Sequence, residues 1–362
     1  MSLKCGIVGL PNVGKSTLFN ALTSAGIDAE NFPFCTIEPN KGIVPVPDKR
    51  LEKISEIVKP DSRIPTTTEF VDIAGLVKGA SEGEGLGNKF LAHIRETQAI
   101  IQVVRCFDND QITHVHNKID PIQDIEIIET ELILADLETL LKLKDRLEKA
   151  SRTGDKDVLY QLEITNLLIS DLEKGISAKD SKIFKEKKKF LEELQLISAK
   201  PCLYVGNVED LDKDNNLVKE FINYLQERSL RSIVLCNQLE AEIAELEKDE
   251  GLEFLNELGI EEPGLNKLIR ESFKILSLQT FFTAGKKEAR AWTIKQGDLA
   301  PQAAGVIHSD FEKGFIRAET ISYDDYIKYN GEQGAKEAGK LRSEGSDYKV
   351  EDGDIIHFRF NV

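Results

Sequence analysis

The sequence predicts an α/β protein whose first domain is interrupted by two long helices and followed by a small α+β domain. Residues 1–119 alternate short apolar runs with helical patterns, as a parallel sheet with covering helices does. From about residue 125 to 196, leucine and isoleucine recur at three- and four-residue steps instead. Beyond Leu278 the composition changes again, because this part holds the only Trp, several glycines and strand-like runs.

The first strand and helix flank a phosphate-binding loop. Residues 9–16 read Gly-Leu-Pro-Asn-Val-Gly-Lys-Ser, between the apolar run Leu3–Val8 and a helix expected from Thr17. Its glycines let backbone N–H groups approach phosphate oxygens. Lys15 adds a charge for the β- and γ-phosphates, and the Ser16 hydroxyl is placed to ligate Mg²⁺. We therefore expect a bound nucleoside triphosphate, held in this loop by Asn12, Val13, Gly14, Lys15, Ser16 and Thr17.

Two downstream segments are candidates for sensing the γ-phosphate, as in Ras-like G domains. The predicted strand Thr67–Val71 ends in Asp72-Ile-Ala-Gly75, so the carboxylate can hold Mg²⁺ and the Gly75 N–H can reach the γ-phosphate. Thr36 lies in a proline-punctuated loop between the two motifs, and its hydroxyl would complete the Mg²⁺ shell. The alternative for Thr36 is an ordinary surface threonine. The predicted Mg²⁺ ligands are thus Ser16, Thr36 and Asp72.

The next strand is predicted at Ile100–Cys106, and the helical segment follows it. Its apolar stripe includes Ile133, Leu137, Leu140 and Leu147, with charges on the remaining faces. This pattern predicts an α-helical hairpin that turns near residues 151–156 and resembles a short antiparallel coiled coil.

The α/β pattern resumes after the hairpin, which is therefore predicted to be an insertion. Further strands are expected at Pro201–Gly206 and Ser232–Cys236, and the C-terminal domain has strand-like runs at Gly314–Ala318 and Ile355–Phe360. The predicted domains are residues 1–125 with 197–277 for nucleotide binding, 126–196 for the hairpin and 278–362 for the α+β domain.

Composition and charge limit the class of protein. The chain of 362 residues is 41% hydrophobic and 30% charged, and its five widely spaced cysteines indicate neither a disulfide framework nor a zinc site. No signal peptide and no apolar run of membrane-spanning length are present, so we expect a cytoplasmic protein without a membrane partner. The net charge of −16 argues against general DNA binding.

The purine is expected to contact the segment Asn207-Val-Glu-Asp210. GTPases carry Asn-Lys-x-Asp here, and Val208 takes the position of the lysine. Asn207 can pair with N7 and the exocyclic group of a purine, so Asn207 and Val208 are predicted nucleotide contacts. Asp210 keeps the carboxylate spacing of guanine readers. A second match, Asn117-Lys-Ile-Asp120, follows a polar loop and is interpreted as coincidental.

These motifs resemble the Obg-like ATPases, the YchF family of translation-factor-type P-loop proteins. The resemblance covers essentially the whole chain, including Asn31–Asn40, Asp72–Leu76 and the tail segments Ala300–Gly305, Asp310–Arg317 and Gly331–Lys336. The tail is similar to a TGS domain, a β-grasp module, and the first domain to an OBG-type G domain. The family implies ATP hydrolysis with Mg²⁺ in the cytoplasm and association with ribosomes. Asp210 departs from the glutamate usual in the family, so GTP stays open beside ATP.

The group that assists hydrolysis is not obvious from the motifs. Leu76 stands where Ras-type enzymes carry the glutamine that orients water. The resemblance points to His114, whose neutral imidazole could orient water, and the alternative is a solvated loop histidine without a catalytic role. Asn12 matches an asparagine that accompanies K⁺ in some P-loop switches, so K⁺ is a second candidate cofactor.

The expected function is a slow ATPase whose nucleotide state controls docking to the ribosome, on the large subunit and including rRNA, in translation or stress regulation. The alternatives are a GTPase of the same architecture and a non-catalytic nucleotide-sensing scaffold. Basic residues of the tail lie close in sequence to aromatic ones, which suits RNA, although the aromatics are equally expected as the core of a small domain. These residues are Lys286, Lys287, Arg290, Lys295, Phe281, Phe282 and Trp292.

Overall fold

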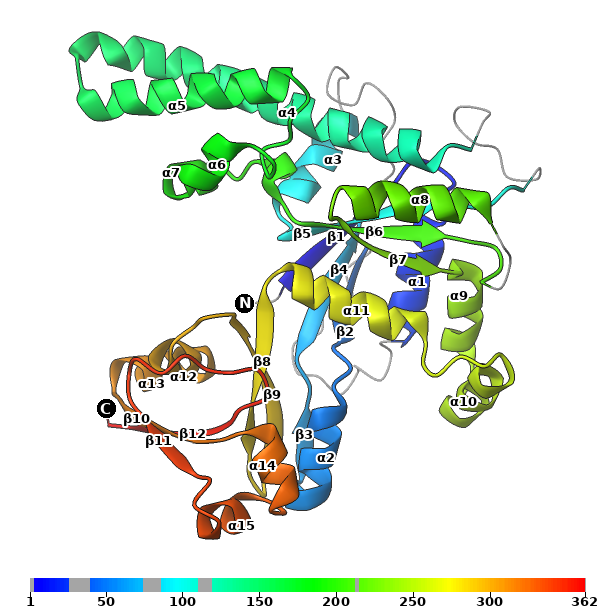
Figure 1. The fold of residues 1–362 in the computed structure, drawn as a ribbon, viewed down its shortest axis with the longest axis vertical. Helices are drawn as coiled ribbons and strands as arrows, with labels where there is room; N and C mark the ends of the chain where they lie inside the picture. The colour runs from blue at the N-terminus through cyan, green and yellow to red at the C-terminus, as the bar shows by residue number, and fades with distance from the viewer. Residues whose placement is uncertain (1–2, 26–39, 74–85, 110–118, 212–214, 362) are drawn as a thin grey trace. The chain divides into compact units, whose positions relative to one another are not determined.

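The computed structural model describes residues 3–25, 40–73, 86–109, 119–211 and 215–361 (Figure 1). The contacts divide the chain into two compact units. The first comprises Met1–Ile43 and Glu69–Leu265, and the second comprises Val44–Thr68 and Asn266–Val362. Helix α11 (Gly264–Ile275) spans the last boundary. The chain therefore passes from one unit to the other three times.

The first unit is built on a six-stranded sheet of order β2-β4-β1-β5-β6-β7. The register shows that β1 with β5, β5 with β6, and β6 with β7 are parallel pairs, which confirms the predicted α/β class. Every residue of β5 is buried, as expected for a central strand covered on both faces. The strands are β1 (Leu3–Val8), β2 (Lys41–Pro45), β4 (Thr67–Asp72), β5 (Ala99–Arg105), β6 (Cys202–Asn207) and β7 (Arg231–Leu235).

The helices of this unit pack on the sheet through apolar faces. Phe221 and Leu225 of α8, for example, lie in one buried cluster with Tyr204 of β6. Helices α1 and α9 contact each other, which brings the start of α9 beside the phosphate-binding loop. The helices are α1 (Lys15–Ala25), α3 (Leu86–Arg95), α8 (Asn216–Glu227), α9 (Asn237–Glu245) and α10 (Lys248–Glu257).

The predicted helical hairpin is confirmed, and its first helix begins earlier than the sequence indicated. Helix α4 (Pro121–Ala150) starts five positions before the predicted boundary at residue 126, because Asp120 caps it and Pro121 occupies its first turn. Its first part contacts β5 and α8, and its later part pairs with α5 (Lys156–Glu173). The connecting turn is a 3₁₀ segment at Ser151–Thr153, where the sequence predicts it.

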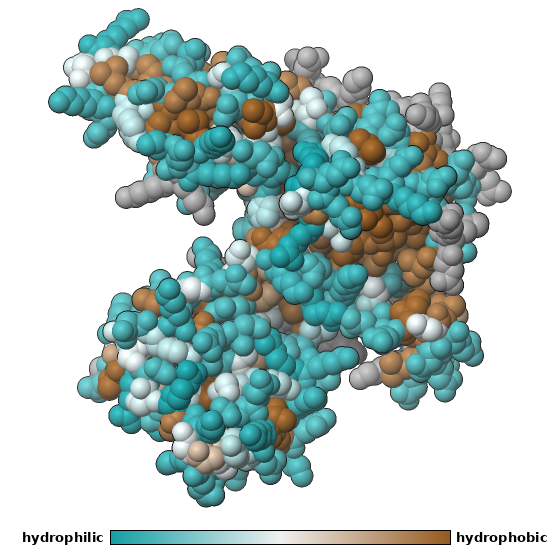
Figure 2. Space-filling model, viewed as in Figure 1, coloured by the Kyte–Doolittle hydropathy of each residue, from teal (hydrophilic) through white to brown (hydrophobic). Residues whose placement is uncertain are grey.

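The base of the hairpin is fixed by a buried carboxylate. Asp136 of α4 accepts hydrogen bonds from the backbone N–H groups of Ile197 (2.8 Å) and Ser198 (2.7 Å) and from the Ser198 hydroxyl (2.6 Å). Burial raises the pKa of this carboxyl, and the three donors oppose that shift. Along the chain, the short helices α6 (Lys182–Glu186) and α7 (Lys188–Glu192) lie between α5 and the Ile197–Ser198 segment that Asp136 binds. The far part of the hairpin carries exposed apolar side chains, including Leu141, Leu159 and Leu167 (Figure 2).

The second unit holds a mixed sheet of order β11-β10-β12-β8-β9-β3. A parallel contact of β12 with β8 joins two antiparallel pairs, β10 with β12 and β8 with β9. Helix α12 (Ala300–Ile307) covers one face together with α13 (Ser309–Lys313), and α14 (Tyr323–Lys328) and α15 (Glu332–Glu337) lie over the other. The strands are β3 (Ser62–Ile64), β8 (Leu278–Ala284), β9 (Glu288–Lys295), β10 (Phe315–Ile321), β11 (Arg342–Glu344) and β12 (Ile355–Phe360).

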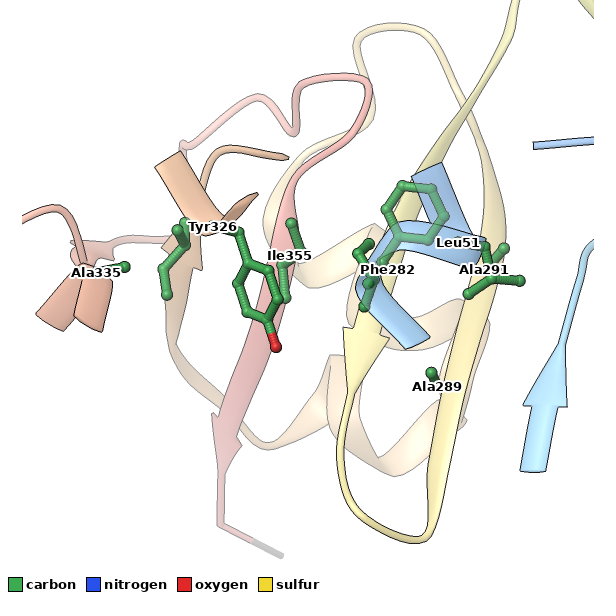
Figure 3. Close-up of a cluster of buried hydrophobic side chains, with 9 residues drawn as sticks. Leu51, Phe282, Ala289, Ala291, Tyr326, Ala335 and Ile355 are labelled. Carbon is green, nitrogen blue, oxygen red and sulfur yellow. The ribbon is translucent and has the colours of Figure 1, made fainter. Parts of the chain in front are cut away.

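A segment from the N-terminal third of the sequence completes this unit, which differs from the predicted domain of residues 1–125. Strand β3 pairs with β9, and helix α2 (Lys49–Val58) places Leu51 and Ile54 in the same buried cluster as Phe282 and Tyr326 (Figure 3). Burial of this apolar face explains why the segment leaves the first unit.

Candidate functional site

The phosphate-binding loop lies between β1, which ends at Val8, and α1, which begins at Lys15. Two loop positions have left-handed backbone, Asn12 with φ 63° and Gly14 with φ 94°. A side chain at position 14 would also collide with the amide of Asn207. Glycine is therefore required there both for the conformation and for the close approach.

Lys15, Ser16 and Asp72 converge at the end of this loop. Lys15 Nζ lies 3.3 Å from Asp72 Oδ1, and the Ser16 hydroxyl donates to Asp72 Oδ2 at 3.3 Å. Asp72 is the last residue of β4, which neighbours β1 in the sheet, so residues 56 positions apart in sequence meet. The lysine and aspartate side chains are only 11% and 14% exposed, and this arrangement holds their charges in place before a ligand arrives.

This set of donors fits Mg²⁺ as it is bound in nucleotide sites. Mg²⁺ is usually held through one or two carboxylates together with substrate phosphates, not by an all-protein cage. The Ser16 hydroxyl and the Asp72 carboxylate offer the protein oxygens. Within the described residues, no group of three or more His, Cys, Asp and Glu side chains could hold a metal. A Mg²⁺ ion here would therefore depend on phosphate oxygens of the nucleotide.

Asn207 ties the phosphate-binding loop to the ends of β6 and β7. Its Nδ2 donates to the Val13 carbonyl at 3.0 Å, and its Oδ1 accepts from the backbone N–H of Asn237 at 3.1 Å. The residue is 5% exposed. The sequence predicted that Asn207 contacts the base. The structure adds a supporting role, because one amide side chain satisfies buried backbone groups of two different loops.

Asn237 is a site residue that sequence reasoning missed. It begins α9 directly after β7, and its Nδ2 donates to the Gly14 carbonyl at 3.1 Å. The residue is 1% exposed, and its buried Oδ1 has no hydrogen-bond partner among the residues that the structure describes. The available signal was its place after a parallel strand, because ligand sites of such sheets gather at the carboxyl ends of the strands.

A second missed feature is the segment after β5. Arg105 is 1% exposed and donates to the backbone carbonyls of Phe107 and Asn109, both at 3.1 Å. Its guanidinium also lies 4.7 Å from the centre of the Phe107 ring. Asn109 Nδ2 donates to Glu209 Oε1 at 3.4 Å. Buried Arg105 thus fixes the course of residues 107–109 at the edge of the site.

A cavity of about 700 Å³, within the range of small-molecule sites, lies at the phosphate-binding loop. Of the predicted nucleotide-binding residues, Asn12, Gly14, Lys15, Ser16, Thr17, Asn207 and Val208 line it. Val13 is buried beside it and contributes the carbonyl that Asn207 binds. Leu10 and Pro11 of the loop also line it. Phe107, Asn109, Glu209, Asn237 and Gln238 are the other lining residues, and they were not predicted as nucleotide contacts. Asp210 is exposed and lines a neighbouring cavity of about 340 Å³ that shares Phe107 and Glu209.

Three predicted residues, Thr36, Gly75 and His114, lie outside the described residues. The second Asn-Lys-x-Asp match can be examined at its last position. Asp120 Oδ1 accepts from the backbone N–H of Gln123 at 3.1 Å, as the N-cap of α4. This capping role agrees with the interpretation that the match is coincidental.

The candidate RNA-contact residues of the tail do not all face solvent. Phe281 and Phe282 are fully buried, on opposite faces of the second sheet. The prediction that bases stack on these two side chains is therefore wrong. Both belong to the hydrophobic core of this unit, as the alternative interpretation of these aromatic residues predicted. Lys286 and Lys287 are exposed, and the Arg290 guanidinium lies 3.9 Å from the centre of the Trp292 ring.

The phosphate-binding loop lies at the carboxyl edge of the sheet, beside an aspartate on the neighbouring strand. This arrangement is typical of P-loop nucleotide-binding proteins with a G-domain fold. Residues 4–135 match the family model described as "50S ribosome-binding GTPase". Residues 278–361 match the model YchF-GTPase_C, described as "Protein of unknown function (DUF933)".

Comparison with whole proteins narrows this class. The chain is 57% identical to "Ribosome-binding ATPase YchF" of Haemophilus ducreyi and 55% identical to the protein of that name in Bacillus subtilis, with all of each chain covered. It also matches the "Structure of the Schizosaccharomyces pombe YchF GTPase" with a TM-score of 0.89 and 37% identity, over 99% of this chain and 98% of the other. The chain belongs to the YchF family.

Within the described parts of the chain, none of the helices is long and apolar enough to cross a membrane.

Proposed function

We propose that this chain is a Mg²⁺-dependent ATPase that binds the ribosome in a nucleotide-dependent way and acts as a switch in translation or stress regulation. The observation that carries the proposal is the convergence of Lys15, Ser16 and Asp72 beneath the phosphate-binding loop. The bacterial relatives at 55–57% identity, named ribosome-binding ATPases, support it over the full length of the chain.

Each residue of the site has a role in this proposal. Backbone N–H groups of the loop and the Lys15 ammonium bind the phosphates, and Asn207 holds the loop in shape. Ser16 and Asp72 hold Mg²⁺, with Thr36 as a third ligand, and Gly75 contacts the γ-phosphate. When bound, Mg²⁺ neutralises charge on the β- and γ-phosphate oxygens.

The group that orients the attacking water is proposed to be His114, because the side chain of Leu76 has no polar atom for this task. Replacing His114 by alanine should slow ATP turnover and leave ATP affinity unchanged. An unaltered turnover rate would exclude His114 from the reaction.

K⁺ is proposed as a second cofactor beside Asn12, which lines the cavity in a left-handed conformation. Turnover should then be faster in K⁺ than in Na⁺ at equal ionic strength. Equal rates in the two salts would remove K⁺ from the proposal.

The ribosome contact is proposed to involve the large subunit and rRNA, through the C-terminal unit, which we assign to the TGS type. Lys286 and Lys287 are exposed and close in sequence to Arg290, so they can meet phosphate groups. Changing these three residues to glutamate should reduce co-sedimentation with ribosomes and leave ATP affinity intact. Unchanged co-sedimentation would argue against this surface. The compartment is the cytoplasm, where ribosomes act.

A second candidate function, that of a GTPase, depends on whether the site prefers adenine or guanine. Asp210 borders the site with a carboxylate that could accept from guanine, which favours a GTPase. A side-by-side calorimetric titration with ATP and GTP in Mg²⁺ decides between them, and we expect tighter binding of ATP.

Lys15→Ala should weaken the affinity for ATP roughly 10- to 100-fold, because a hydrogen bond to a charged group contributes about 1.5–3 kcal/mol. No heat with either nucleotide would overturn the proposal.

A further inference from the structure

Asn237, the first residue of α9, contacts the phosphate-binding loop from a distant part of the sequence. Its Nδ2 donates to the Gly14 carbonyl at 3.1 Å, across 223 positions of the chain. The same carbonyl accepts the Leu18 N–H at 3.0 Å, as the first hydrogen bond of α1. Asn237 is therefore a second donor to this carbonyl, and it reaches the loop from outside α1.

Two amide side chains hold consecutive carbonyls of the loop. Asn207 Nδ2 donates to the Val13 carbonyl at 3.0 Å. Asn237 binds the next carbonyl, that of Gly14. A trans peptide is planar, so its C=O and N–H groups point in opposite directions. The N–H groups of Gly14 and Lys15, which follow these two carbonyls, are therefore directed away from both amides.

These two N–H groups form a pair that suits an anion. Among the described residues, neither of them finds an acceptor. Asn12 and Gly14 have positive φ, whereas Val13 between them does not. Successive N–H groups converge where the backbone alternates in this way. Gly14 and Lys15 also line the cavity at the loop, so the paired donors belong to the proposed phosphate site.

Helix α9 is a fixed support for the contact with Gly14. About one turn after Asn237, the Glu240 carboxylate accepts from the backbone N–H groups of Gly264 at 2.8 Å and Leu265 at 3.1 Å. Glu240 is 4% exposed, and α9 also packs against α1. Asn237 thus holds the Gly14 carbonyl from a helix whose first turn is itself anchored.

Stability of the fold does not explain why an amide stands at position 237. Its Oδ1 is buried and has no hydrogen-bond partner in the described part of the chain. The amide cannot turn over to relieve this, because Oδ1 would then face the Gly14 carbonyl, which only accepts. An unpaired buried acceptor is unfavourable by at least as much as one neutral hydrogen bond is favourable. The contribution of the Asn237 side chain to folding is therefore close to zero or unfavourable.

We propose that Asn237 is a positioning residue for phosphate. By holding the Gly14 carbonyl, it aims the N–H groups of Gly14 and Lys15 at phosphate oxygens of the nucleotide. The inference rests on the proposed function, because it takes the loop as the site of a triphosphate. Asn237 acts on the phosphates and not on the base, so its effect extends to an inorganic polyphosphate.

The test compares MgATP with inorganic tripolyphosphate in Mg²⁺, each titrated calorimetrically into the full-length protein. Asn237→Ala should weaken both ligands by the same factor, roughly 2- to 12-fold, which is the contribution of one neutral hydrogen bond. The thermal unfolding midpoint of this variant should equal or exceed that of the wild type, because the unpaired acceptor is removed together with the donor. A residue with a merely structural role would lower the midpoint.

Two further variants sharpen the comparison. Asn237→Asp keeps the shape of the side chain but places a carboxylate against the Gly14 carbonyl, so it should weaken tripolyphosphate more than Asn237→Ala does. Gln238→Ala is the matched control, because Gln238 is exposed and lines the same cavity, and its Nε2 donates to Glu242 at 2.9 Å instead of to the loop. The control should bind tripolyphosphate as the wild type does.

The outcomes separate this inference from the function on which it rests. If the wild type binds neither ligand, the proposed function falls together with the role of Asn237. If the wild type binds ATP, equal affinity of Asn237→Ala for tripolyphosphate overturns the inference alone. So does a loss confined to ATP, which would place the effect at the base, or a loss that accompanies a lower unfolding midpoint. Binding of ATP without any binding of tripolyphosphate at millimolar concentration would also overturn it.

Discussion

Asn207 shows how one side chain can support a ligand loop. Its amide side chain donates a hydrogen bond to the Val13 carbonyl, in the loop after β1, and accepts one from the Asn237 N–H, just after β7. Its removal leaves two buried backbone groups without partners, and each such group costs about 1–3 kcal/mol. The loop is thus held by a hydrogen-bond network before any phosphate is bound.

We predict that Asn207→Ala lowers the free energy of unfolding of the first unit by about 2 kcal/mol and weakens ATP binding. Chemical denaturation followed by far-UV circular dichroism, together with calorimetric titration, measures both effects. Asn20→Ala is the matched control, because Asn20 is exposed on α1. A variant with unchanged ATP affinity would show that the loop keeps its shape without Asn207.

The residues of this site were unequally visible in the sequence. Lys15, Ser16 and Asp72 belong to motifs whose spacing and strand context indicate their chemistry, and they meet as predicted. Asn237 belongs to no motif, and it reaches Gly14 only because α9 packs against α1. Such a contact depends on tertiary packing, which a linear pattern does not contain.

At the scale of elements, strands β10 and β12 are linked by an ion-pair cluster. Arg317 and Arg359 both contact Glu319, and these two hydrogen-bonding arginines lower the pKa of its carboxyl to about 2. The pKa of this carboxyl in the folded state therefore lies below 4.5, the ordinary value of an unpaired glutamate. The sign of the effect follows from linkage: the cluster stabilises the folded state above pH 4.5, and this contribution is lost as the pH falls toward 2.

We predict that the difference in stability between the wild type and Glu319→Gln is present at pH 7 and smaller at pH 3. Urea denaturation followed by Trp292 fluorescence measures it in the unit that contains the cluster. Glu337→Gln, on α15 of the same unit, serves as the control for removal of a negative charge. A difference that does not change between the two pH values would show that the carboxyl of Glu319 has an ordinary pKa.

The elements themselves were largely predictable. The apolar runs at Leu3–Val8 and Ile355–Phe360 correspond to β1 and β12 without any shift of their bounds. The start of α4 was misplaced, because the leucine pattern marks the face that packs and not the residue at which a helix begins. That residue is set by the Asp120 cap and by Pro121, which an apolar periodicity does not include.

At the scale of the whole molecule, the second unit is not a continuous segment of the chain. Leu51 and Ile54 belong to its core, and Arg50 binds Asp352 at 2.7 Å. The sequence of residues 49–58 shows an apolar helix face, but it does not show which distant strands that face will cover. The predicted domain of residues 278–362 therefore covers most of the second stretch of the unit, which begins at Asn266, and omits its first stretch, Val44–Thr68.

We predict that residues 266–362 expressed alone are less stable than the same unit within the full chain. The isolated segment lacks α2 and β3, so Phe282, Ala289 and Ala291 lose apolar cover. Thermal unfolding followed by Trp292 fluorescence should give a lower midpoint, and a fusion of residues 44–68 to 266–362 should restore it. Equal midpoints for the short segment and the full chain would show that α2 contributes nothing to folding.

The three passages of the chain between its units have a consequence for biosynthesis. Strand β3 ends at Ile64, whereas its partner β9 begins at Glu288, so the ribosome must add more than about 200 residues before the two can pair. At about 5–20 residues per second, that delay is roughly 10–45 s. During this time the nascent α2 has no sheet to cover, and its apolar side chains are available to chaperones.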